Sequence, residues 1–91
     1  MNDKKMLELA AKAAGYSCRI RTTKIGIEKF YINGHVWNSL DDDGDALRLA
    51  VKLDIDVAKV QIKFWDKHSI NPYAATRRAI VRAAAEIGKG K

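Results

Sequence analysis

The stretch that decides the fold is WNSLDDDGDALRLAVKL, residues 37–53. Its first half places four aspartates just ahead of an apolar helical stripe. Free backbone N–H groups and the positive end of the helix dipole stabilise negative charge at such a position. The stripe begins at Ala46, and we therefore predict a helix from Asp43 to Leu53. This helix start separates a strand-rich part of the chain from the part that follows.

A first helix and three short strands are predicted ahead of this stretch. Asn2 or Asp3 caps the helix, which ends at Gly15. Side chains then alternate between apolar and polar in Tyr16–Thr23, and residues 27–32 are rich in β-forming side chains. Asn33-Gly34 is a strong hairpin signal before a short return strand at residues 35–37.

A fourth strand and a last helix are predicted after the central helix. Residues 58–65 alternate apolar with polar side chains, which is typical of a half-buried strand. Asn71-Pro72 starts the last helix, which we expect to reach about Ile87, with a frayed tail at residues 88–91. The predicted fold class is α+β: one domain, residues 1–91, with an antiparallel sheet of about four strands packed by three helices in the order α-β-β-β-α-β-α.

The amino-acid composition limits the kinds of function that the chain can have. The chain has 91 residues, a formal net charge of +6 and a single cysteine, which excludes an internal disulfide. No apolar run approaches the ~20 residues that cross a bilayer, and we expect a cytoplasmic protein that does not act at a membrane. Aspartates are concentrated in residues 38–56, and positively charged residues predominate on either side of this stretch. A net positive charge favours acidic partners, but in this chain the positive and negative charges lie in separate segments.

The aspartate-rich stretch also has a calcium-loop interpretation. Counted from Ser39, Gly44 occupies the sixth position that such a loop needs. Ala50 occupies the twelfth position, where the loop needs a bidentate glutamate. Helix capping is therefore the favoured interpretation, and we predict no metal or other cofactor.

No spacing in the chain is typical of catalysis. Cys18, His35 and His68 do not have the spacing of a zinc site. A phosphate loop, a nucleophile elbow and a carboxylate–histidine pair are also missing from the sequence. Cys18 falls on the apolar side of its strand, where a thiol packs as a small hydrophobic group. We therefore expect a protein that is not an enzyme and acts by binding.

Three binding modes remain open. A protein partner would use the arginines of the last helix and the acidic stretch, namely Arg77, Arg78, Arg82, Asp41, Asp42, Asp43 and Asp45. A nucleic-acid partner would use cations and aromatic rings that alternate along the strands, namely Arg19, Arg21, Lys29, Tyr31, Lys63 and Trp65. A homodimer would use the edge of the strand at Tyr16–Thr23.

Three segments resemble small accessory proteins of tailed phages and prophages. They are LELAAKAAG at residues 7–15, WN with DDGDALRLAVKL at residues 37–38 and 42–53, and YAATRRAIVRAAA at residues 73–85. The resemblance places the chain near the phage α-β-α sandwich group, which implies helices on both faces of the sheet. It also implies a non-enzymatic protein in the cytoplasm of the host cell that binds a host or phage protein, including as an inhibitor of a host defence complex. Ser39 departs from the group, which has proline there.

Overall fold

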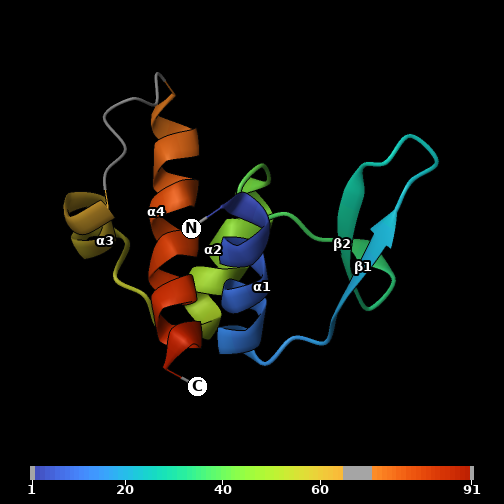
Figure 1. Ribbon diagram of the computed structural model, residues 1–91. Helices are drawn as coiled ribbons and strands as arrows, with labels where there is room; N and C mark the ends of the chain where they lie inside the picture. The colour runs from blue at the N-terminus through green and yellow to red at the C-terminus, as the bar shows by residue number, and fades with distance from the viewer. Residues whose placement is uncertain (1, 65–70, 91) are drawn as a thin grey trace.

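The computed structural model describes residues 2–64 and 71–90, which form four helices and a three-stranded sheet (Figure 1). In chain order the elements are α1 (Asp3–Ala14), β1 (Cys18–Thr22), β2 (Glu28–Ile32), β3 (His35–Val36), α2 (Asp43–Lys52), α3 (Val57–Phe64) and α4 (Pro72–Lys89). The predicted α+β class with a small antiparallel sheet is confirmed. The predicted order α-β-β-β-α-β-α is wrong at its sixth element, which is a helix.

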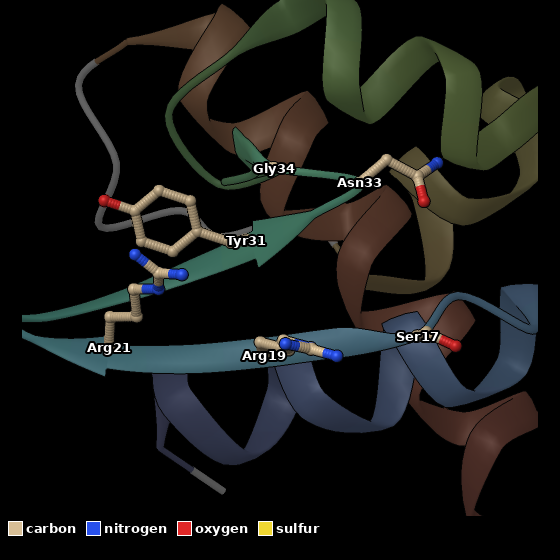
Figure 2. Close-up of a pocket in the computed structure, with 6 residues that line it drawn as sticks. All are labelled: Ser17, Arg19, Arg21, Tyr31, Asn33 and Gly34. Atoms are coloured by element: carbon tan, nitrogen blue, oxygen red, sulfur yellow. The ribbon is translucent and has the colours of Figure 1, made fainter.

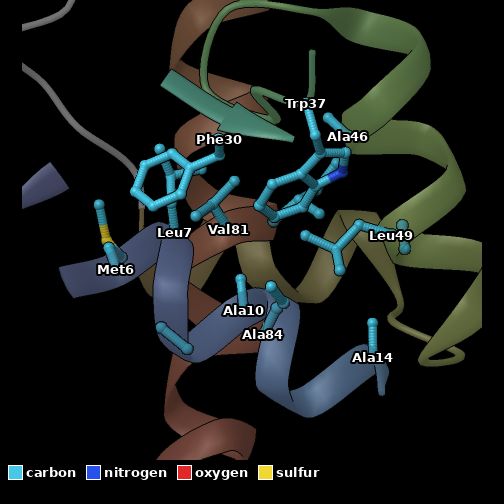
Figure 3. Packing of buried hydrophobic residues seen from close by; sticks show 14 residues of the cluster. Met6, Leu7, Ala10, Ala14, Phe30, Trp37, Ala46, Leu49, Val81 and Ala84 are labelled. Atoms are coloured by element: carbon cyan, nitrogen blue, oxygen red, sulfur yellow. The ribbon is translucent and has the colours of Figure 1, made fainter. Parts of the chain in front are cut away.

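The core lies between α1, α2 and α4, and small side chains line the contact between α1 and α4 (Figure 3). On this contact the buried alanines include Ala10, Ala11, Ala14, Ala84 and Ala85. Larger side chains fill the space toward α2 and the sheet, among them Leu7, Phe30, Trp37, Leu49 and Val81. The small alanine side chains let the two helix backbones approach each other closely. Direct van der Waals contact between the helices therefore fills space that larger side chains fill in other protein cores.

The end of α4 differs from the prediction. The helix continues through Gly88 to Lys89, and Gly88 is buried, so it is neither a helix stop nor the start of a frayed tail. A Cβ atom placed on Gly88 would lie 2.1 Å from the carbonyl oxygen of Leu9 in α1. Gly88 is therefore the residue that lets the two helix backbones touch.

The strand predicted at residues 58–65 is wrong over residues 58–64, which belong to the helix α3. Asp56 begins this helix, since its Oδ1 accepts a hydrogen bond from the N–H of Lys59 at 3.2 Å. Val57 and Val60 lie one helical turn apart and pack against the core, whereas Ile62 is 86% exposed. The alternation along residues 58–65 that favoured a strand is thus not used for burial, and packing against α4 selects the helical spacing of Val57 and Val60 instead.

The sheet is a meander in the order β1-β2-β3 that extends from the helices (Figure 1). Asn33 and Gly34 have φ angles of 53° and 80°, so the hairpin turn predicted at these residues is confirmed, with both turn residues in the left-handed region. Phe30 of β2 and Trp37 after β3 are buried against the helices and tie the hairpin to the core. Helices therefore pack against one face of the sheet, and the implied helix layer on its other face is not found among the described residues.

Candidate functional site

The acidic stretch is used mainly to build the start of α2. Asp42 is the N-cap, and its Oδ1 accepts from the N–H of Asp45 at 2.9 Å. Asp45 and Asp41 accept from the backbone N–H and the side-chain amide of Asn38, at 3.0 and 3.1 Å. The capping interpretation is confirmed, and these carboxylates are already engaged in local hydrogen bonds.

The arginines of α4 are engaged as well. Arg77 donates from Nε to the carbonyl oxygen of Leu40 at 2.8 Å and from Nη1 to Oδ1 of Asp43 at 2.6 Å. Arg78 pairs with Asp3 at 2.8 Å, and the guanidinium of Arg82 lies 5.5 Å from the ring centre of Phe64. The two charged patches predicted for a protein partner therefore meet at the Arg77–Asp43 pair, where they neutralise each other.

The β1–β2 hairpin brings four of the predicted nucleic-acid contacts to one face. The register pairs Arg19 with Tyr31 and Arg21 with Lys29 across the two strands. Side chains opposite one another in an antiparallel pair point to the same face of the sheet. This outer face of the hairpin is turned away from Phe30, and Arg19, Arg21 and Lys29 are exposed.

The acidic residue next to Lys29 in the sequence is directed to the other face of the sheet. Glu28, the acidic residue of β2, lies on the opposite face and pairs with Lys4 of α1 at 2.9 Å. This contact raises the pKa of Lys4 through its hydrogen bond and charge interaction with Glu28. Within residues 2–64 and 71–90, neither Arg19 nor Lys29 forms an ion pair.

A cavity of about 330 Å³ opens on the outer face of the hairpin (Figure 2). Its lining residues come from both strands and their ends: Ser17, Arg19, Arg21, Tyr31, Asn33 and Gly34. The guanidinium of Arg21 lies 5.4 Å from the ring centre of Tyr31, and the two side chains stand together in Figure 2. A cation over a ring face is an attractive contact that fixes the orientation of both groups. The cavity thus combines Arg19, which has no ion pair with a described residue, with the paired side chains of Arg21 and Tyr31.

The remaining predicted nucleic-acid residues do not join this face. Lys63 belongs to α3, where its Nζ lies 5.3 Å from the ring centre of Phe64, and α3 is separated from the hairpin by α4 and α1 (Figure 1). The prediction that Lys63 shares the sheet face is therefore wrong. Trp65 and His68 lie outside the described residues.

The lining residues Ser17, Asn33 and Gly34 were missed as site residues in the sequence. Asn33-Gly34 was recognised as a turn but not as the end of a cavity. Ser17 has the same parity as Arg19 and Arg21, and the alternation along the strand placed it on their side, although it was not predicted to bind a ligand. The β1 strand is one edge of the sheet. In a symmetric antiparallel pairing of two copies centred on Ile20, Arg19 would face Arg21, so repulsion disfavours this register of the predicted dimer.

Cys18 has no feature of a reactive thiol. Its side chain is half-buried beside α1, and desolvation raises the pKa of the thiol above its ordinary value, with Glu8 adding to this effect. A raised pKa keeps the group protonated near neutral pH, and the protonated form is a weak nucleophile.

Comparisons of the chain with protein-family models, with curated proteins and with solved structures found no match. The resemblance to phage accessory proteins stays a prediction. None of the described helices combines the length and the apolar character that a membrane span requires.

Proposed function

We propose that this protein is a non-enzymatic nucleic-acid-binding module and that it binds through the outer face of the β1–β2 hairpin. The observation that carries the proposal is the grouping of Arg19, Arg21 and Lys29 with Tyr31 on one exposed face, while Glu28 lies on the other face. Cations on such a face pair with phosphate oxygens, and arginine does so through a planar fork of donors. Phosphate contacts supply most of the affinity of non-specific nucleic-acid binding.

The side chains of the outer face take little part in the packing of the core. They lie outside the buried cluster, and Arg19 and Lys29 have no ion pair with a described residue. The arginines of α4, by contrast, are held by Asp43, Asp3 and Phe64. A ligand can therefore reach the hairpin cations without breaking intramolecular contacts of Arg19 and Lys29, which favours the hairpin over α4 as the anion site.

The test is a binding measurement by fluorescence anisotropy with labelled DNA and RNA oligonucleotides. We expect binding by the wild-type chain, and a loss of roughly 10-fold or more in the double variant Arg19→Gln/Lys29→Gln, because each removed phosphate contact lowers affinity. The matched control is Lys52→Gln/Lys59→Gln, which removes the same net charge from α2 and α3 at exposed positions. Equal losses in the two double variants would contradict the assignment of the site to the hairpin.

A second candidate function is the binding of a host or phage protein, and an apolar groove between α2 and α4 favours it. The groove encloses about 270 Å³ and is lined in part by Leu47, Val57, Tyr73 and Ile80. Leu47 and Tyr73 are 60% and 69% exposed, although both are large apolar side chains. Exposed apolar groups of this kind are enriched at protein interfaces.

The groove is tested by affinity capture of partners from phage-infected cells with the wild-type chain and the variant Leu47→Asp. We expect a captured protein to be lost with Leu47→Asp and retained with the control Ile25→Asp, which changes an exposed apolar residue at the hairpin tip. A protein captured equally by both variants would rule out the groove as its binding site.

A further inference from the structure

We propose that the cavity on the hairpin seats one unpaired nucleotide of a single-stranded nucleic acid, with its base against the Tyr31–Arg21 pair and its phosphate on Arg19. This inference rests on the proposed function and specifies its ligand. A nucleic-acid duplex is the competing ligand, since a two-stranded β-ribbon can also enter a DNA major groove.

The size of the cavity suits a small ligand unit. A volume of about 330 Å³ stands at the lower end of the range for small-molecule pockets, roughly 300–1,000 Å³. The cavity ends at the Asn33-Gly34 turn, where Gly34 contributes no side chain and a Cβ placed there would have no atom within 4 Å. A strand of nucleic acid can therefore leave the cavity past this turn while one of its nucleotides stays inside.

The planar groups of the cavity favour an unpaired base. In a duplex both faces of each base are covered by its neighbours, and only the base edges and the backbone are accessible. Bases of single strands instead stack on aromatic rings or on arginine guanidinium planes. Tyr31 and Arg21 present one group of each kind at 5.4 Å from one another, and both line the cavity (Figure 2).

The phosphate position follows from the strand register. Arg19 is the cross-strand partner of Tyr31, so the two side chains leave the backbone at the same position along the hairpin. Ser17 lies two residues earlier on the same side and adds a hydroxyl donor to the cavity lining. A nucleotide that stacks at Tyr31 therefore has its phosphate within the reach of a long arginine side chain and a hydroxyl.

The distinguishing experiment measures affinity for a labelled oligothymidylate and for a labelled duplex, with the wild-type chain and with Tyr31→Leu and Tyr31→Phe. We expect tighter binding of the single strand, a loss of roughly 5- to 150-fold for the single strand in Tyr31→Leu, and little change for the duplex. Tyr31→Phe retains the ring and should stay within about 2-fold of wild type for both ligands.

A second measurement does not depend on any variant. Photo-crosslinking of the wild-type chain to an oligonucleotide that contains iodouracil, followed by peptide mapping, should place the crosslink at Tyr31. Crosslinks confined to residues outside the hairpin would overturn the inference.

The outcomes separate the inference from the proposed function. Binding that is sensitive to salt and is weakened by Arg19→Gln/Lys29→Gln supports the proposed function. If the single strand and the duplex then bind with equal affinity and Tyr31→Leu has no effect, the nucleotide site is overturned and the proposed function stands. No binding of either ligand at low salt overturns both.

Discussion

Arg77 of α4 and Asp43 of α2 form an ion pair at 2.6 Å, and Arg77 also donates to the carbonyl oxygen of Leu40 in the loop before α2. Two groups that are separated by 34 positions in the chain and carry opposite charge thus contact each other where α2 begins. The side chain of Arg77 is only 16% exposed. This contact is structural, because it joins α4 to the loop and the helix start.

We predict that Arg77→Gln lowers the free energy of unfolding by about 1–3 kcal/mol. The substitution removes a charged donor whose own side chain is largely buried, and it takes this donor from the part-buried carbonyl oxygen of Leu40 and from the exposed carboxylate of Asp43. Arg78→Gln is the matched control on the same helix, because the Arg78 side chain is more exposed than that of Arg77 and its surface pair with Asp3 should be worth about 0–1 kcal/mol. Urea denaturation followed by circular dichroism measures both variants, and equal effects would argue against a structural role of Arg77.

A second prediction concerns the contact between α1 and α4. Gly88→Ala places a methyl group 2.1 Å from the carbonyl oxygen of Leu9, so the helices must separate. We expect a destabilisation of about 1–3 kcal/mol from this overpacking, in spite of the better helix propensity of alanine. Gly90→Ala is the control, since its nearest atom is the carbonyl oxygen of Ile87 at 3.5 Å. Thermal unfolding of the two variants gives the comparison, and a stable Gly88→Ala protein would refute the close approach.

A third prediction distinguishes the helix α3 from a strand at the same residues. A strand would place Val60 and Ile62 on one buried face, whereas α3 packs Val60 against the core and leaves Ile62 86% exposed. Ile62→Gln should therefore change the free energy of unfolding by less than about 0.5 kcal/mol, and Val60→Gln should cost at least about 1 kcal/mol. Similar costs for the two variants would favour the strand.

A fourth prediction concerns Ser39, which is fully buried. Its hydroxyl oxygen has no hydrogen-bond partner among the described residues. Burial of an unsatisfied hydroxyl is unfavourable, so Ser39→Ala should leave stability unchanged or raise it by up to about 1 kcal/mol. The control is Ser17→Ala at an exposed position, which should have no effect on unfolding. A clear loss of stability in Ser39→Ala would show that the hydroxyl has a partner in solution.

Local signals in the sequence predicted much of the fold. Asn2, Asp42 and Asn71 each accept a backbone N–H at a helix start. Asn71 was predicted as a cap, whereas Asn2 was one of two candidates and Asp42 one of four aspartates at the predicted helix start. The hairpin turn was recognisable for the same reason, because Asn33-Gly34 tolerates two left-handed residues in succession. These features depend on neighbours within a few residues, and such neighbours are visible in a sequence.

The errors arose where two patterns compete or where contacts are distant. Residues 57–64 carry both a period of two and a helical period, and only packing against α4 decides between them. Gly88 looks like a helix stop until Leu9 is known to lie against it. The pairing of Arg77 with Asp43 depends on how two helices cross, which no spacing in the chain records.

The candidate site was predicted in part. Alternation along each strand placed Arg19 and Arg21 on one side, and Lys29 and Tyr31 on one side, without saying whether the two pairs share a face. The strand register, which pairs Arg19 with Tyr31, shows that the two pairs lie on the same face of the sheet. Because Phe30 is buried on the opposite face, the face that carries the two pairs is exposed. The cavity at the hairpin depends on this register, so it could not be read from either strand alone.

The salt dependence of oligonucleotide binding tests the central claim most directly. With two phosphate contacts from Arg19 and Lys29, the logarithm of the association constant for a single strand should fall against the logarithm of salt concentration with a slope of about −1.4. In Arg19→Gln/Lys29→Gln, which retains neither of these contacts, the slope should be shallower by about 1.4. A slope that is the same in the wild-type chain and in this variant would contradict binding through the outer face of the hairpin.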